Sequence, residues 1–154
     1  MKRTFGVVLT LAFSMVFVGA TDANAAKKPT NISVKLQEFS IVPLPSAEAN
    51  AGKVRIKAVN SGTLTHEMVL VRAASETALP KVTTPGGERP VGAVDEEAIP
   101  EQDKVGETGD VKPGKTVTKT FTLSPGRYVM FCNIDDGTGN HFARGMESSF
   151  FVTK

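Results

Sequence analysis

The chain is poor in three residue types on which many functional sites depend. Its 154 residues include one cysteine, two histidines and no tryptophan. A lone cysteine cannot form a disulfide within the chain, so Cys132 needs another explanation. Two histidines are too few for metal clusters that require several imidazoles. The sequence also lacks a Gly-rich phosphate loop followed by a helix and the Cys–His signatures of hydrolases, so nothing points to those enzyme classes.

Long apolar runs are absent after the N-terminal segment. The chain begins with Lys2 and Arg3, continues with the uncharged run FGVVLTLAFSMVFVGA, and reaches the small-residue pattern ANA ahead of Ala26. This order is typical of a secretory signal peptide. We therefore expect a signal peptide at 1–25 and a periplasmic or secreted mature chain at 26–154, with no membrane insertion after cleavage. If the leader were retained, the same run would anchor the protein in a membrane.

Neither sign of charge is in excess. The sequence has 18 basic and 16 acidic residues, and without Lys2, Arg3 and Asp22 these become 16 and 15, a net charge of +1. This balance gives no electrostatic case for a nucleic-acid partner. The remaining length is that of a single domain, which we expect to be a monomer.

Helical periodicity is nearly absent, whereas strand periodicity is frequent. In NISVKL and KVRIKA apolar residues alternate with polar ones, as in half-buried strands. TVTKTFTL places its threonines on one face, and EMVLV, RYVMF and SFFV are apolar on both parities, as strands inside a sandwich are. Turns rich in Gly, Pro and Asn separate these segments, so the sequence predicts an all-β, Greek-key β-sandwich. After Glu38 the apolar phase shifts to Phe39 and Ile41, which predicts a β-bulge.

One segment interrupts the strand pattern. Residues 74–112 contain four prolines and the run DEEAIPEQDKVGETGD, which has seven acids and one lysine. We expect a long acidic, Pro-rich insertion loop between strands, in which VDEEAI has the composition for one helical turn. The plain interpretation is a solvated connection. The alternative is a docking surface for a basic partner, whose binding would strengthen at low salt.

Four residues with metal-binding side chains lie where predicted strands meet loops. His66 opens the strand EMVLV, Cys132 follows RYVMF, and His141 and Met146 come next with the spacing C-x8-H-x4-M. A β-sandwich gathers such loops at one end, so these side chains can converge. Taken singly, each would more often be a packing or hydrogen-bonded residue. Together they match the thiolate, two imidazoles and weak axial thioether of a blue-copper centre.

The mature chain resembles the cupredoxins, which are small exported type 1 copper proteins. THEMVLV is similar to the strand of their upstream histidine, SPGRYVMFC to their P-G-x-Y-x-x-x-C strand, and CNIDDGTGNHFARGM to their ligand loop. The acidic insertion and the final GMESSFFV resemble bacterial and archaeal cupredoxin-domain proteins related to sulfocyanin. The resemblance implies a cupredoxin domain at 26–154 that binds one copper ion, as Cu(I) or Cu(II), through His66, Cys132, His141 and Met146.

The chain departs from the better-known relatives in two ways. Plastocyanins and azurins usually have Asn after the upstream histidine, where its side chain ties the ligand loops together. Here Glu67 stands at that position, so either another clamp holds the loop or the site is looser. The eight residues between Cys132 and His141 resemble the type 1 loop of copper nitrite reductases. Those enzymes, like multicopper oxidases, flank the cysteine with histidines that lead to a second copper site, whereas this chain has Phe131 and Asn133. The resemblance therefore implies an electron carrier and not an enzyme.

The expected function is the transfer of single electrons between redox partner proteins by an outer-sphere route. We expect the electron to pass through the loop-side edge of His141, beside an apolar docking patch of Phe142, Ala143 and Gly145. The main alternative is a periplasmic carrier or scavenger of copper that serves an oxidase or a resistance system, although open sites of that kind are richer in Met and His. Two weaker alternatives are a copper-free structural domain and calcium at the aspartates of DDGTGN.

Overall fold

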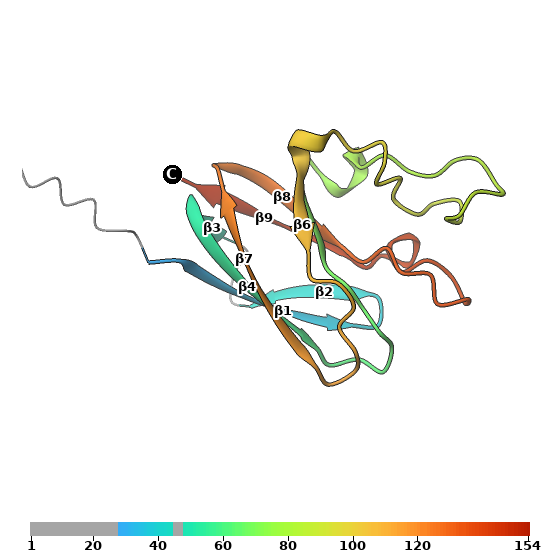
Figure 1. The fold of residues 1–154 in the computed structure, drawn as a ribbon, viewed down its shortest axis with the longest axis horizontal. Helices are drawn as coiled ribbons and strands as arrows, with labels where there is room; N and C mark the ends of the chain where they lie inside the picture. The colour runs from blue at the N-terminus through green and yellow to red at the C-terminus, as the bar shows by residue number, and fades with distance from the viewer. Residues whose placement is uncertain (1–27, 45–47) are drawn as a thin grey trace, which may run out of the picture.

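The computed structural model describes residues 28–44 and 48–154, and this part of the chain forms nine strands in two sheets. One sheet has the order β2-β1-β4-β7 and the other β3-β9-β8-β5-β6 (Figure 1). The first comprises β1 (Thr30–Gln37), β2 (Ser40–Leu44), β4 (Gly52–Asn60) and β7 (Thr116–Leu123). The second comprises β3 (Glu48–Asn50), β5 (Val69–Arg72), β6 (Lys104–Glu107), β8 (Gly126–Phe131) and β9 (Glu147–Thr153). The predicted signal peptide lies outside the described residues.

The alternation seen in the sequence sets the main core between the sheets. In β1 and β4 every second side chain is buried while the lysines and arginine between them are exposed. These strands pair in parallel, so Val34 and Ile56 come to lie on the same inner face and meet Met130 and Phe150 of the other sheet. Such burial contributes roughly 1.5–3 kcal/mol for each large aliphatic side chain. The predicted all-β, Greek-key sandwich is confirmed.

A second, smaller core lies on the outer side of the five-stranded sheet. There Val71, Val129 and Phe131 are buried under Leu79 and Val94, which belong to the segment between β5 and β6. This cover explains why EMVLV and RYVMF are apolar on both parities. The segment is therefore not a purely solvated connection, since Leu79, Val94 and Ile99 pack on the sheet.

The insertion predicted at 74–112 is not one unbroken loop. Its C-terminal part forms β6, an edge strand that pairs with β5, and Val111 makes an isolated bridge with His66. Before β6 the segment contains two short 3₁₀ turns, η1 (Glu76–Ala78) and η2 (Glu101–Asp103). VDEEAI forms no regular helix: Val94 makes an isolated bridge with Lys81, and residues 95–99 form two successive hydrogen-bonded turns.

The predicted β-bulge after Glu38 is also wrong. The chain turns back at this point, and Gln37 pairs with Ser40, so Glu38 and Phe39 form the tip of a two-residue hairpin between β1 and β2. Phe39 has a φ of 38°, a left-handed conformation that is rare for an aromatic residue. A phase shift of one residue is common to a bulge and to a hairpin, so apolar periodicity alone did not distinguish them.

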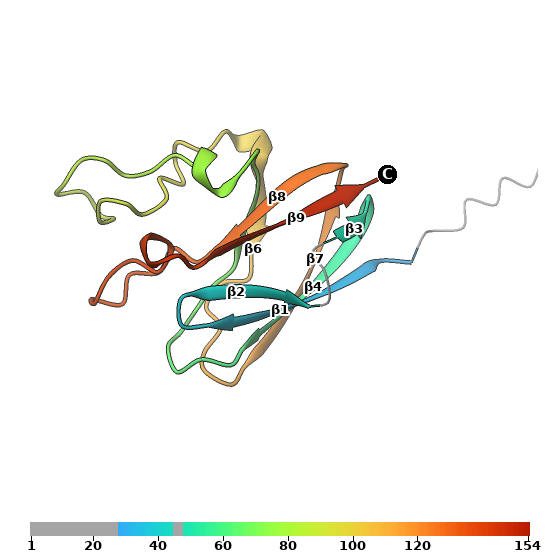
Figure 2. The ribbon, with the colours of Figure 1, turned by 180° about the vertical axis from the view of Figure 1, so that it is seen from behind.

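The hairpin tip, the loop 132–146 and much of the insertion gather at the end of the sandwich opposite the C-terminus (Figures 1 and 2). The third 3₁₀ turn, η3 (Phe142–Arg144), lies in this loop. Within the described part of the chain, none of the helices has the length and apolar character that a membrane crossing requires.

Candidate metal centre

Three of the four predicted ligand residues converge at this end of the sandwich. The side chains of His66, Cys132 and His141 offer ligand atoms that all lie within 4.8 Å of one another. The two Nδ1 atoms are 3.2 Å apart, and Cys132 Sγ is 3.3 Å from Nδ1 of His141. All three residues are fully buried. We call this group the His–Cys–His cluster.

His66 is held in place by backbone pairing and by a buried asparagine. Its N–H and C=O pair with Val111, at 3.2 and 2.7 Å. The side-chain amide of Asn60 donates to the carbonyl oxygens of Leu64 and Val111, which fixes the turn that precedes His66. These bonds satisfy buried backbone groups and leave the imidazole of His66 directed inward.

The other residues sit on a loop that is closed by its own backbone. The N–H of Cys132 donates to the carbonyl of Met146 at 3.1 Å, and the N–H of Met146 donates to the carbonyl of His141 at 3.0 Å. Gly145 ends the short turn η3 with a φ of 94°, a conformation that glycine adopts without strain. Met146 is fully buried within the main core. Its role as the axial ligand stays a prediction.

Glu67 itself forms the clamp between the loops, which the sequence alone did not identify. Its backbone N–H donates to Cys132 Sγ at 3.4 Å, and its carboxylate accepts the N–H of Asn133 at 3.0 Å. The two loops that carry His66 and Cys132 are therefore joined by a reciprocal pair of bonds, which we call the Glu67 clamp. Burial raises the pKa of the Glu67 carboxyl, and the Asn133 N–H acts against this.

Asn133 ties the cysteine loop to the insertion. Its side-chain amide pairs with both backbone groups of Val94, at 3.0 and 2.9 Å, and donates to Glu96 at 2.7 Å. Glu96 in turn forms an ion pair with Arg89 at 3.0 Å. The carbonyl of Asn133 accepts from the side chain of Asn140 at 2.8 Å. One residue next to the cysteine therefore connects the loop 132–146 with the cover of the sheet.

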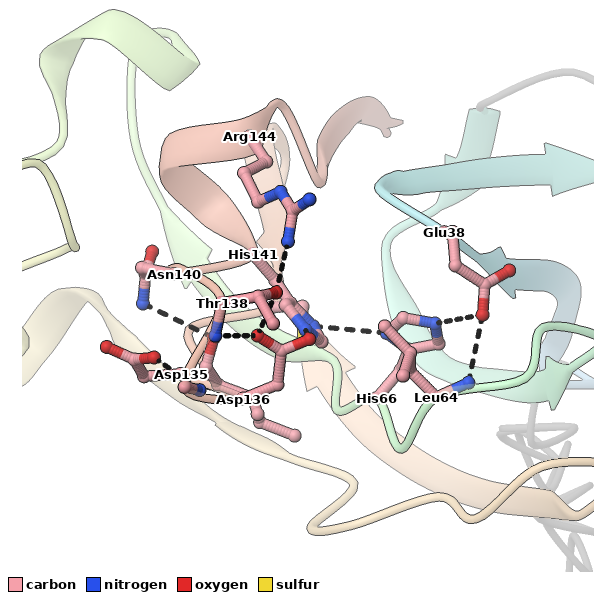
Figure 3. A network of polar contacts seen from close by, with 12 residues as sticks. Glu38, Leu64, His66, Asp135, Asp136, Thr138, Asn140, His141 and Arg144 are labelled. Atoms are coloured by element: carbon pink, nitrogen blue, oxygen red, sulfur yellow. Dashed lines mark hydrogen bonds and ion pairs between the residues drawn. The ribbon is translucent and has the colours of Figure 1, made fainter.

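Two carboxylates face the outer nitrogens of the histidines (Figure 3). Glu38 Oε1 lies 3.8 Å from Nε2 of His66, and Asp136 Oδ2 lies 3.4 Å from Nε2 of His141. The N–H groups of Leu64 and Thr63 lower the pKa of Glu38 to about 2. The hydroxyl and N–H of Thr138 likewise lower the pKa of Asp136 to about 2, so both groups are carboxylates at neutral pH.

The predicted docking patch is wrong in two respects. His141 has no exposed edge, because the ring of Phe39 packs against it with centroids 5.2 Å apart and the Arg144 guanidinium lies 3.7 Å from the Phe39 ring centroid. Phe142 is buried in the second core, where it packs against Phe131. Ala143 and Gly145 are exposed as expected.

The two aspartates of DDGTGN have other partners than calcium. Asp135 accepts the N–H of Gly137 at 2.9 Å, and Asp136 accepts the N–H and hydroxyl of Thr138 at 2.9 and 2.7 Å. Among residues 28–44 and 48–154, the His–Cys–His cluster is the one group of three or more Cys, His, Asp or Glu side chains close enough to share an ion.

The chemistry of the His–Cys–His cluster fits copper. A thiolate is a soft ligand and an imidazole is a borderline one, which together suit an ion that alternates between Cu(I) and Cu(II). Burial raises the pKa of the Cys132 thiol to about 11, so the metal must displace its proton to bind. Burial and the neighbouring His141 lower the pKa of His66, which keeps its imidazole neutral and able to bind a cation.

Sequence reasoning found the cluster because cysteine and histidine are rare in this chain. It missed Glu38 and Asp136, whose proximity to the imidazoles depends on turn geometry that the sequence does not specify. The change of apolar phase at Glu38 was the one visible signal, and it marked a turn without showing which end of the sandwich the turn approaches.

Comparison with known proteins gives a likeness in structure. No protein-family model matches the chain, and comparison with curated proteins gives no significant match. An auracyanin from the photosynthetic bacterium Roseiflexus castenholzii has a TM-score of 0.55 and 20% identity, over 81% of this chain and 98% of that one. Auracyanin A from Chloroflexus aurantiacus, described as a blue copper protein, has a TM-score of 0.51 and 19% identity over 82% and 100%.

An azurin from Methylomonas sp. strain J also matches, with a TM-score of 0.51 and 13% identity over 81% of this chain and 98% of that one. Auracyanins and azurins are cupredoxins, and at these identities the likeness concerns the fold. The closer resemblance to sulfocyanin-related proteins stays a prediction. The chain therefore has the cupredoxin fold, and the buried His–Cys–His cluster at its loop end fits one type 1 copper ion.

Proposed function

We propose that the protein is an exported type 1 copper protein that carries single electrons between redox partner proteins. The observation that carries this proposal is the convergence of two Nδ1 atoms and one Sγ atom in a fully buried site. In this proposal His66, Cys132, His141 and Met146 would hold the ion. The bound copper supplies a one-electron couple, Cu(II)/Cu(I).

The chain's own contribution is to keep the ligand atoms fixed. The Glu67 clamp joins the two ligand loops, and the bond from Cys132 to Met146 closes the second loop. A site held in this way rearranges little when its charge changes by one unit. Electrostatic and hydrogen-bonding groups that are already in place do not have to reorganise during the transfer.

The covered position of His141 changes the route that we propose for the electron. A partner that approaches the loop end meets the Arg144 guanidinium and the Phe39 ring before it meets His141. We propose that the electron crosses this pair of side chains to the buried imidazole. The partner proteins themselves are redox proteins without a more specific identification.

A role in copper delivery is the second candidate. It would require the ion to leave the site readily, whereas the His–Cys–His cluster is fully buried, and Phe39 and Arg144 cover His141. The fully buried cluster therefore favours a carrier of electrons over a carrier of copper or an enzyme.

Repeated redox cycling in the presence of a Cu(I) chelator distinguishes these functions. The copper-loaded protein is reduced with ascorbate and reoxidised with ferricyanide, and the copper that remains bound is measured after each cycle. An electron carrier retains its copper through many cycles and exchanges one electron per ion. Loss of copper to an acceptor apoprotein faster than to the chelator would contradict electron transfer and support delivery.

A further inference from the structure

We propose that Glu38 and Asp136 are positioning residues: they hold both imidazoles with Nδ1 toward the metal and lower the reduction potential of the bound copper. This inference rests on the proposed function, because it concerns the same ion. It adds two residues from outside the ligand set, one at the β1–β2 hairpin tip and one in the ligand loop.

Each imidazole has one ring nitrogen next to the other imidazole and its second ring nitrogen next to a carboxylate. Their Nδ1 atoms face each other at 3.2 Å, so their Nε2 atoms point away from the cluster, to Glu38 and Asp136 (Figure 3). Both Nε2 atoms are buried and have no hydrogen bond of good geometry within the described residues. The carboxylates of Glu38 and Asp136 lie at ion-pair distances of 3.8 and 3.4 Å from these nitrogens and are the charged groups beside them.

The position of the single proton on each neutral imidazole explains the role of these contacts. A neutral imidazole carries one proton, so binding the metal through Nδ1 requires the proton to reside on Nε2. A buried N–H needs an acceptor, and a carboxylate stabilises it better than a neutral group does. Hydrogen bonding of the second nitrogen fixes the tautomer and ring orientation of a metal-bound histidine and makes it a more basic ligand.

Glu38 is held at the hairpin tip by bonds to the turn before His66. Its Oε1 accepts the N–H groups of Thr63 and Leu64 and the hydroxyl of Thr63. The fit is close, because a Cβ added at Gly62 would lie 2.5 Å from the same oxygen. The neighbouring Phe39, with its positive φ, turns the hairpin tip over the site.

Asp136 divides its two oxygens between the turn and the histidine. Oδ1 accepts the N–H and hydroxyl of Thr138, and Arg144 donates to the same hydroxyl at 2.8 Å. Oδ2 is the atom that faces His141. This contact is shorter than that of Glu38, and the Asp136 side chain is 17% exposed against 34% for Glu38, so Asp136 has the larger expected effect.

Two negative charges beside the imidazoles favour the oxidised ion. Cu(II) carries one more positive charge than Cu(I), so a carboxylate at either Nε2 stabilises the oxidised state more strongly. More basic imidazoles act in the same direction. Removing either charge therefore raises the reduction potential.

The test compares the variants Asp136→Asn and Glu38→Gln with Asp135→Asn. The amides keep the size of each side chain and an oxygen that accepts from the local turn. Asp135 is the matched control, because it carries the same charge in the same turn but accepts only the N–H of Gly137. The midpoint potential of copper-loaded protein is the first readout. We expect at least a tenfold shift toward the reduced form for Asp136→Asn, about 59 mV for one electron, and a smaller shift in the same direction for Glu38→Gln.

The second readout uses copper-free protein and is independent of any redox activity. Nitrogen NMR of the imidazoles reports which ring nitrogen carries the proton. Because one of the two Nδ1 atoms can donate to the other in copper-free protein, the comparison with the wild type is the readout. We expect a larger Nδ1–H fraction than in the wild type for His141 in Asp136→Asn and for His66 in Glu38→Gln. A potential that moves no more than in Asp135→Asn, or tautomers that do not change, overturns the assignment of that residue. Wild-type protein that takes up no copper contradicts the proposed function instead, and the tautomers still judge the positioning.

Discussion

At the residue scale, burial decides the chemistry of Cys132. The side chain is fully enclosed, and burial raises the pKa of its thiol from 9.0 to about 11. The N–H groups of Glu67 and Ile134 act in the opposite direction but do not offset the loss of water. In the copper-free protein Cys132 is therefore a neutral thiol at physiological pH.

This shift predicts a loss of stability of the copper-free protein in alkali. The folded state holds the Cys132 proton more tightly than the unfolded state, so the stabilisation is complete below about pH 9 and is lost as the pH rises toward 11. The loss amounts to at most about 3 kcal/mol for a shift of two pKa units. Urea denaturation from pH 8 to 11 measures it. A Cys132→Ser variant, which has no thiol to titrate, should lack this part of the pH dependence; equal slopes for both proteins would refute the shift.

The Glu67 clamp gives a second prediction at this scale. In Glu67→Ala the buried N–H of Asn133 loses its acceptor, which costs about 1–3 kcal/mol of unfolding free energy. Glu67→Gln keeps an oxygen at the same place and should cost much less. Chemical denaturation of the two copper-free variants, compared with the wild type, measures both values. Equal losses in both variants would mean that the charge of Glu67, and not its acceptor oxygen, holds the loops.

Rarity made the members of the His–Cys–His cluster predictable from sequence. Cys132 and the two histidines stand out because the chain has few of their kind, and strand periodicity places them at strand ends. Acidic residues are numerous, so nothing in the sequence singles out Glu38 and Asp136. Their contacts with the imidazoles depend on two turns whose direction follows from tertiary packing.

At the scale of elements, the insertion is a cover fixed to the ligand loop. Its apolar residues fill the second core, and Asn133 pairs with both backbone groups of Val94. Sequence reasoning recognised the acidic, Pro-rich composition but not this packing. Single apolar residues in an acidic stretch give no periodic signal, so the burial of Val94 and Ile99 was not apparent. The edge strand β6 was not apparent either.

Breaking this connection should loosen the insertion without unfolding the sandwich. In Asn133→Ala both backbone groups of Val94 lose their partner, and Glu96 loses a hydrogen bond. We expect faster amide hydrogen exchange across residues 80–99 and earlier tryptic cleavage after Lys81, which is exposed. Glu97→Ala, a change at an exposed position of the same segment, should leave exchange unchanged. Uniformly faster exchange in all strands of Asn133→Ala would instead indicate a loss of global stability.

At the scale of the whole molecule, the sheets form the stable cores, and the loops at one end hold the His–Cys–His cluster. The sheets bury the cores, and the loops at one end bring together residues as far apart in sequence as His66 and His141. Alternating periodicity and turn residues were sufficient to predict this architecture. They were not sufficient to predict that the hairpin tip and Arg144 cover His141, because that depends on the positive φ of Phe39 and on side-chain stacking.

The visible absorption spectrum of the copper-loaded protein tests the central claim most directly. Purified protein that receives one equivalent of Cu(II) should turn intensely blue, because the Cys132 thiolate transfers charge to the ion. Ascorbate should bleach the colour, ferricyanide should restore it, and Cys132→Ala should remain colourless. A colourless wild-type protein, or a blue colour that survives in Cys132→Ala, would contradict a type 1 copper centre at the His–Cys–His cluster.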